Sequence, residues 1–110
     1  MQRDEVRLRH MLDAAEEAVS FMVDHTRSDL DTDKLLALAM VRLLEIIGEA
    51  AHAVTEETQQ KNPQIPWRQI KGTRNRLIHG YYHVDMDIVW QIVRQDLPPL
   101  IANLEKMINS

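Results

Sequence analysis

Apolar side chains recur at helical spacing through the first 22 residues and predict a long amphipathic helix there. They form one stripe: Leu8, Met11, Leu12, Ala15, Val19 and Met22. The segment that follows, residues 24–31, is polar and rich in helix-capping side chains. We therefore expect a connector at residues 24–31, with Asp31 or Thr32 capping the next helix.

A second, longer helix is predicted from this cap to about Gln60. One seam of apolar positions consists of Leu36, Met40, Leu43, Ile47, Ala50 and Val54. Six further apolar residues widen this surface around most of the helix: Leu35, Leu38, Ala39, Val41, Leu44 and Ile46. Such a helix is expected to be central. Gly48 costs this helix about 1 kcal/mol relative to alanine, and the close approach of another backbone would explain its presence.

A polar line crosses the same helix through Arg42, Glu45, Glu49 and His52, at spacings of three, four and three. These residues therefore lie on one side of the helix. Two interpretations remain open: a solvated or ion-paired edge, or a polar cleft shared with another helix or subunit. In the second, Glu45 and Glu49 are candidate cleft residues.

Prolines and glycines divide the remainder of the chain. Pro63 and Pro66 indicate a loop over residues 61–67, because each disfavours helix at the residue before it. A shorter helix is expected over residues 67–82, with Gly72 as the point where it could break.

Two further helices are expected near the C-terminus. Asp85 is suited to cap a short helix that continues to Val93. The sequence Leu97-Pro98-Pro99 should stop or kink that helix. A final amphipathic helix follows over residues 97–108.

These patterns together predict an all-α fold. The 110 residues include three glycines and four prolines, and no segment shows sustained strand-type alternation. The expected architecture is a single domain, residues 1–110, built as an up-and-down bundle of four main helices and a short one.

Composition excludes several classes of protein. Without cysteine, the chain has no disulfides, zinc ribbons or thiol nucleophile. The longest apolar run, from Leu35 to Val41, is too short to span a membrane. The N-terminus lacks the apolar region of a secretory signal, so a cytoplasmic location is expected.

One segment is basic although the chain carries a net charge of −4. No Asp or Glu lies between Thr58 and Val84, and the cations there are Lys61, Arg68, Lys71, Arg74 and Arg76. On a continuous helix, Asn75, His79 and His83 would be successive i, i+4 neighbours on one face. Arg74, Leu77, Ile78 and Tyr81 would lie along another side.

Arginine beside histidine suits phosphodiester chemistry. A guanidinium can hold a phosphoryl oxygen through two hydrogen bonds, and an imidazole can take or give a proton near neutral pH. In RNA the 2′-OH supplies the nucleophile, so neither metal nor cofactor is needed. The same residues could instead form a solvated or interface helix. His79 and His83 could bind a metal in principle, but the intervening glutamate and third ligand of metallohydrolases are missing, so we expect no metal site.

Three segments resemble the HepT family of HEPN-domain toxins in matching order: residues 42–51, residues 63–67, and Arg74 to Asp85. The signature is Arg, four residues, His, one residue, Tyr, here Arg74, His79 and Tyr81. The resemblance implies a helical homodimer with the Arg and His of both subunits at a shared cleft. It also implies metal-independent ribonuclease activity and a minimal nucleotidyltransferase antitoxin of the MntA type as partner.

The resemblance also implies roles for individual residues. Arg74 would stabilise the pentavalent phosphate and His79 would act as general acid/base. Asn75 would orient the site, with Arg76 supporting it. Tyr81 matches the tyrosine that the antitoxin modifies with AMP.

Two hypotheses follow. The first is a toxin-type endoribonuclease that cleaves RNA by 2′-OH attack and is neutralised by adenylylation of Tyr81. The alternative is a non-catalytic helical module that docks a nucleotidyltransferase, with the basic segment as an interaction surface.

Overall fold

The computed structural model of the chain describes residues 2–79 and 83–109, except for the side chains of residues 2 and 79. Most of this backbone is helical: α1 Gln2–Met22, α2 Asp29–Thr32, α3 Lys34–Ala53, α4 Glu56–Lys61, α5 Trp67–Lys71, α6 Thr73–Leu77, α7 Met86–Gln91, the π-helix η1 Ile92–Asp96, and α8 Leu97–Ile108. Two short strands, β1 (Ile78–His79) and β2 (His83–Val84), lie between α6 and α7. The predicted all-α class is confirmed, with this strand pair as an unexpected addition.

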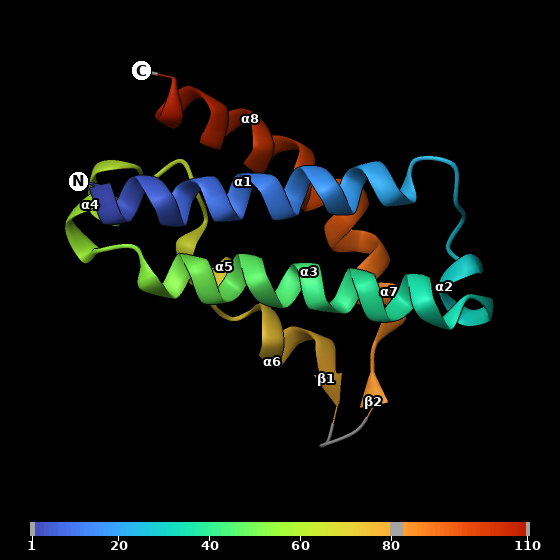
Figure 1. Ribbon diagram of the computed structural model, residues 1–110. Helices are drawn as coiled ribbons and strands as arrows, with labels where there is room; N and C mark the ends of the chain where they lie inside the picture. The colour runs from blue at the N-terminus through green and yellow to red at the C-terminus, as the bar shows by residue number, and fades with distance from the viewer. Residues whose placement is uncertain (1, 80–82, 110) are drawn as a thin grey trace.

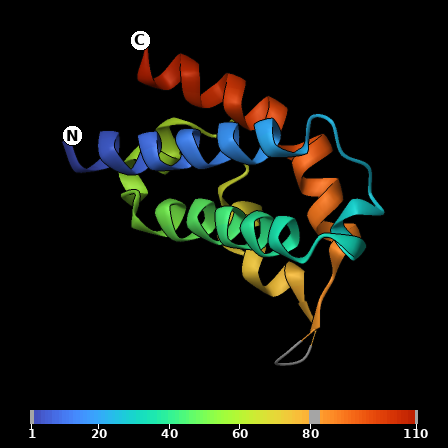
Figure 2. The same cartoon turned by 45° about the vertical axis from the view of Figure 1, so that its right-hand side comes forward.

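The three longest helices, α1, α3 and α8, form the frame of the molecule (Figure 1). α1 and α3 lie antiparallel and side by side, and α8 packs on α1. In the turned view of Figure 2, α6 and the strand pair again lie on the side of α3 that faces away from α8. The long helices therefore lie in successive layers, and α6 and the strand pair lie at one edge of the molecule.

The core lies between these three helices. Met11, Met40 and Leu104 are fully buried, one from each helix. The predicted stripe of α1 is confirmed, because five of its six residues are buried and Val19 is partly buried. Each fully buried side chain of this size contributes about 1.5–3 kcal/mol of transfer free energy.

The apolar surface of α3 is only partly covered. Its seam is buried from Met40 to Val54, whereas Leu35 and Leu38 are 80% and 56% exposed. Phe21 and Val23, at the end of α1, are also exposed. The wide apolar circumference predicted for this helix therefore extends beyond what the chain itself buries.

The prediction of one helix to about Gln60 is wrong, because α3 ends at Ala53. Thr55 has extended backbone, and its hydroxyl accepts a hydrogen bond from the Thr58 N–H at 3.4 Å. This N-cap starts a separate helix, α4. The helix predicted over residues 67–82 is divided at Gly72, which confirms the break point named from the sequence, but it ends early, at Leu77. The architecture therefore has three long helices and several short ones rather than four main helices.

The start of α3 differs slightly from the prediction. Asp33 is the cap, and its carboxylate accepts a hydrogen bond from the Leu36 N–H at 3.1 Å. Asp31 and Thr32 belong instead to the short helix α2. The predicted cap at Asp85 is confirmed by hydrogen bonds from the backbone N–H groups of residues 87 and 88.

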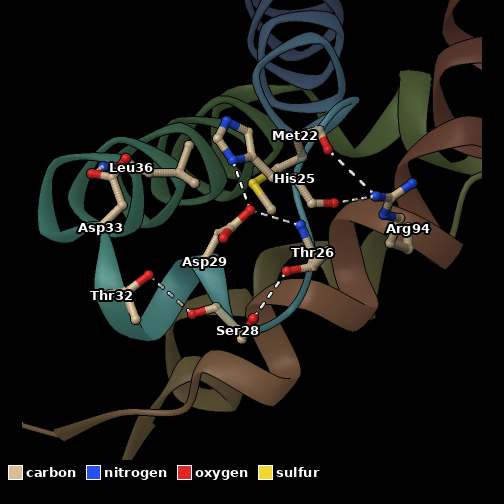
Figure 3. Close-up of polar contacts among 9 residues, drawn as sticks. All are labelled: Met22, His25, Thr26, Ser28, Asp29, Thr32, Asp33, Leu36 and Arg94. Atoms are coloured by element: carbon tan, nitrogen blue, oxygen red, sulfur yellow. Dashed lines mark hydrogen bonds and ion pairs between the residues drawn. The ribbon is translucent and has the colours of Figure 1, made fainter.

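The connector between α1 and α2 is held by local polar contacts and by Arg94 from η1 (Figure 3). The Asp29 carboxylate accepts hydrogen bonds from the Thr26 N–H and the His25 ring, both at 2.9 Å, and these contacts lower the pKa of Asp29. Arg94 donates to the carbonyls of Met22 and His25, at 3.4 and 2.8 Å. Arg94 thus joins the last residue of α1 and the connector that follows it to η1.

The predicted kink at Leu97-Pro98-Pro99 is observed as a change of helix type and direction. The π-helical turn η1 ends at Asp96, and α8 begins at Leu97 with both prolines in its first turn. Proline costs little there because the first N–H groups of a helix have no partner. Figures 1 and 2 show α8 pointing away from the direction of α7. Within residues 2–79 and 83–109, no helix combines the length and apolar character needed to cross a bilayer.

Asp4 ties the start of α1 to the start of α4. Its side chain is buried and accepts hydrogen bonds from the Thr55 N–H at 3.0 Å, the Thr55 hydroxyl at 2.6 Å and the Thr58 hydroxyl at 2.5 Å. The hydroxyl of Thr55, then that of Thr58, lowers the pKa of Asp4, against an opposing effect of burial. The break between α3 and α4 is therefore anchored by a carboxylate far away in sequence.

We expect Asp4→Asn to lower the free energy of unfolding at neutral pH by about 1–3 kcal/mol, because it replaces an ionised carboxylate that accepts three hydrogen bonds. A lowered folded-state pKa stabilises the fold above the unfolded-state pKa, near 4, and the effect is lost as pH falls further. Urea unfolding at pH 7 and pH 3 should thus show a smaller difference between variant and wild type in acid. Asp13→Asn, at an exposed position of α1, is the control. A penalty for Asp4→Asn that is equal at both pH values would contradict this role.

Candidate functional site

A pocket of about 240 Å³ lies between the second half of α3 and the α5–α6 segment. Its residues come from both sides: Glu45, Gly48, Glu49 and His52 from α3, and Lys71, Thr73 and Arg74 from the basic segment. The polar line predicted on α3 therefore does face another helix.

Gly48 allows the two sides of the pocket to approach each other. A Cβ at this position would lie 3.2 Å from the Ile70 carbonyl oxygen and 3.8 Å from the Thr73 Cβ. Thr73 is itself buried, and its hydroxyl donates to the same Ile70 carbonyl at 2.6 Å. The close backbone approach predicted from Gly48 is confirmed, and it fixes the start of α6 against α3.

Both interpretations of the polar line on α3 prove correct in part. Arg42 lies 3.7 Å from Glu45 and 3.5 Å from Glu49, so the outer edge is ion-paired. The two carboxylates also line the pocket that contains Lys71 and Arg74. Arg42 thus offsets negative charge that would otherwise repel an anionic ligand.

His52 is fixed to the opposite wall of the pocket. Its Nε2 lies 3.1 Å from the Lys71 carbonyl oxygen. Lys71 in turn donates from Nζ to the Gln59 side chain at 3.0 Å, and buried Gln59 donates to the Val54 carbonyl at 2.9 Å. These bonds connect α3, α4 and α5 just before Arg74.

The structure separates the two predicted arginines. Arg74 is exposed and lines the pocket, and among the described residues it has no ion-pair partner. Arg76 points elsewhere: it lies 3.5 Å from Asp96 of η1, and both side chains are partly buried. Asn75, between them, is exposed. The pocket therefore includes Arg74 but not Arg76.

The predicted helical face of Asn75, His79 and His83 is wrong. α6 ends at Leu77, and β1 pairs antiparallel with β2, so that His79 lies opposite His83. The proposed line from Arg74 through Ile78 to Tyr81 is also wrong beyond Leu77. The side chain of His79 and all of Tyr81 lie outside the described residues.

The strand pair is closed by tertiary contacts. Asp85 donates its N–H to the Leu77 carbonyl at 2.7 Å while its side chain caps α7. A signal for this hairpin is present in the sequence, since aromatic and β-branched residues surround Gly80. His52 belongs to the polar line predicted on α3, but its pairing with Lys71 was not predicted, because this contact joins two segments 19 residues apart.

Comparison with known proteins identifies the family. A family model described as "Ribonuclease HepT-like" matches residues 11–107. The chain is 37% identical over 95 residues to "Probable ribonuclease HepT" of Thermococcus cleftensis, which covers 83% of this chain and 86% of that protein. It is 34% identical over 98 residues to "Putative RNase MJ1380" of Methanocaldococcus jannaschii, which covers 89% of this chain and 90% of that protein. No solved structure gives a significant match. Because the family model spans nearly the whole chain, this protein belongs to the HepT-like ribonuclease family.

Proposed function

We propose that this protein is a metal-independent endoribonuclease that binds RNA at the Arg74 pocket. The observation that carries the proposal is the guanidinium of Arg74, which has no ion-pair partner among the described residues and lies in a polar pocket, five residues before His79 in a family of ribonucleases. Arg42 and Arg76, by contrast, are engaged by carboxylates. A guanidinium without a carboxylate partner is free to bind phosphate.

The proposed reaction is an in-line transphosphorylation. The 2′-oxygen bonds to the adjacent phosphorus, and the bond from phosphorus to the 5′-oxygen breaks. The products are a 2′,3′-cyclic phosphate and a 5′-hydroxyl. Arg74 stabilises the charge of the pentavalent phosphate, His79 transfers a proton, and Asn75 helps to orient the site.

The enzyme is proposed to act as a homodimer with a shared cleft. Exposed apolar side chains at the start of α3 and the end of α1 support this: Leu35, Leu38, Phe21 and Val23. Burial of such side chains in a two-fold interface would remove apolar surface from water.

Adenylylation of Tyr81 by a nucleotidyltransferase antitoxin is the proposed regulation, in a toxin–antitoxin pair. Tyr81 lies two residues after His79 in the sequence. An AMP group there adds bulk and negative charge close to the catalytic pair in sequence. The charge would compete with RNA phosphate for Arg74.

The test compares protein expressed alone with protein co-expressed with a nucleotidyltransferase of the MntA type. We expect the first to cleave RNA in the presence of EDTA and to be dimeric by light scattering, and His79→Ala to remain folded and dimeric without cleavage. Intact mass and peptide mapping should show AMP on Tyr81 of the co-expressed protein, with cleavage lost. If neither sample cleaves RNA and neither is modified, the binding module that docks a nucleotidyltransferase becomes the better account.

A further inference from the structure

His52 is a titratable side chain in the pocket to which the reaction above gives no role. It lies on the last turn of α3 and lines the same pocket as Arg74. It is exposed, so that a ligand in the pocket can reach it. The charged groups that line this pocket with it are Glu45 and Glu49 of α3, Lys71 of α5 and Arg74 of α6.

Its hydrogen bond defines the tautomer of the neutral ring. The Lys71 carbonyl oxygen can only accept, so Nε2 of His52 carries the hydrogen and donates it over 3.1 Å. Nδ1 then carries the lone pair, and no described residue is bonded to it. An imidazole held at one nitrogen by a fixed acceptor, with the other free, is the arrangement expected of a general base.

Cleavage of RNA needs proton transfer at two oxygens. The 2′-OH must lose a proton as it attacks, and the departing 5′-oxygen must gain one. The shared cleft of the proposed dimer would offer the His79 of each subunit for these transfers. The Arg74 pocket is itself lined by a different histidine of the same chain, His52.

We infer that His52 is a second proton-transfer residue of this site and acts as the base for the 2′-OH; this inference rests on the proposed ribonuclease function. Nδ1 of His52 takes the 2′-hydroxyl proton while the 2′-oxygen forms its bond to phosphorus. The bond to the 5′-oxygen breaks, and that oxygen takes its proton from the imidazolium of His79. Water then returns the two rings to their starting protonation states.

Two substitutions separate this role from a structural one. His52→Gln places an amide N–H where Nε2 lies, so it can keep the bond to the Lys71 carbonyl but cannot titrate. His52→Ala loses both the bond and the base. His10→Gln, at an exposed position of α1, is the control for removing a surface histidine.

The rate of RNA cleavage should be measured across pH 5 to 9, with kcat and KM determined separately. We expect His52→Gln to lower kcat about 10- to 100-fold with KM nearly unchanged. The acid limb of the pH profile should disappear while the alkaline limb remains. A His52→Gln enzyme with wild-type kcat and profile would overturn the inference.

A binding measurement keeps this result distinct from failure of the proposed function. A fully 2′-O-methylated oligoribonucleotide cannot react, and its addition should shift the NMR resonances of the His52 ring and the Arg74 guanidinium together. A shift at Arg74 without one at His52 would place His52 outside the site. If wild-type protein neither cleaves RNA nor binds this oligonucleotide, the proposed function fails and the role of His52 fails with it.

Discussion

Replacing Arg74 by alanine should lower kcat/KM for RNA by about 10²- to 10³-fold while the free energy of unfolding stays nearly unchanged. The loss follows because the guanidinium is proposed to bind the phosphoryl oxygens as their charge develops. Stability should be preserved because Arg74 is exposed and, among the described residues, forms no ion pair. Cleavage of labelled RNA and urea unfolding of the same preparations measure the two quantities.

Two further variants sharpen this prediction. Arg74→Lys keeps the charge but loses the planar pair of donors, so it should recover only part of the activity. Arg68→Ala removes an equivalent charge from the exposed surface of α5, outside this pocket, and should change kcat by less than about threefold. Equal losses in Arg68→Ala and Arg74→Ala would mean that the basic segment contributes only general attraction, and would argue against a specific role for Arg74.

Gly48→Val should destabilise the fold by about 2 kcal/mol and also impair cleavage. Even a Cβ at this position would lie 3.2 Å from the Ile70 carbonyl, and valine adds two methyl groups. Overpacking of this kind costs about 1–3 kcal/mol when neighbouring backbone must move. The backbone that must move leads directly to Thr73 and Arg74, so the pocket should change shape as well.

Urea unfolding with a matched control tests the role of Gly48. Ala53→Val places the same β-branched residue at an exposed position of α3, outside the pocket and the proposed dimer interface, and should cost less than about 1 kcal/mol. Gly48→Ala should be less harmful than valine, because its gain in helix propensity offsets part of the tight contact. A Gly48→Val protein as stable as wild type would show that α5 can move away freely.

Local sequence patterns were enough to predict the helical class and the faces of α1 and α3. Burial of the stripe from Leu8 to Met22, the cap at Asp85 and the close contact at Gly48 are all confirmed. The first two features depend on the spacing of residues within one helix. The third depends on Gly48 alone, because a glycine lowers the stability of a helix and is explained only where another backbone lies close. These features are local, and the periodicity of apolar positions along the chain predicts the buried faces of the helices.

The candidate site was only half predictable from the chain. Arg74, Glu45 and Glu49 were identified from the sequence, and they do line one pocket. The pairing of His52 with Lys71 was not visible, and Arg76 proved to face Asp96 instead. Residues two apart on a helix point to different sides, and only the packed neighbours decide which side becomes the pocket.

Residue spacing along the chain is enough to specify the amphipathic helices and a basic segment with the family's Arg-His-Tyr spacing. Where the long helices end depends instead on contacts between segments far apart in the sequence. Asp4 reaches Thr55 across 51 residues and fixes the break after α3. The contact between Asp85 and Leu77 closes the strand pair in place of the expected helix. Hydrogen bonds between distant segments outweigh local helix propensity, which amounts to less than about 1 kcal/mol per residue.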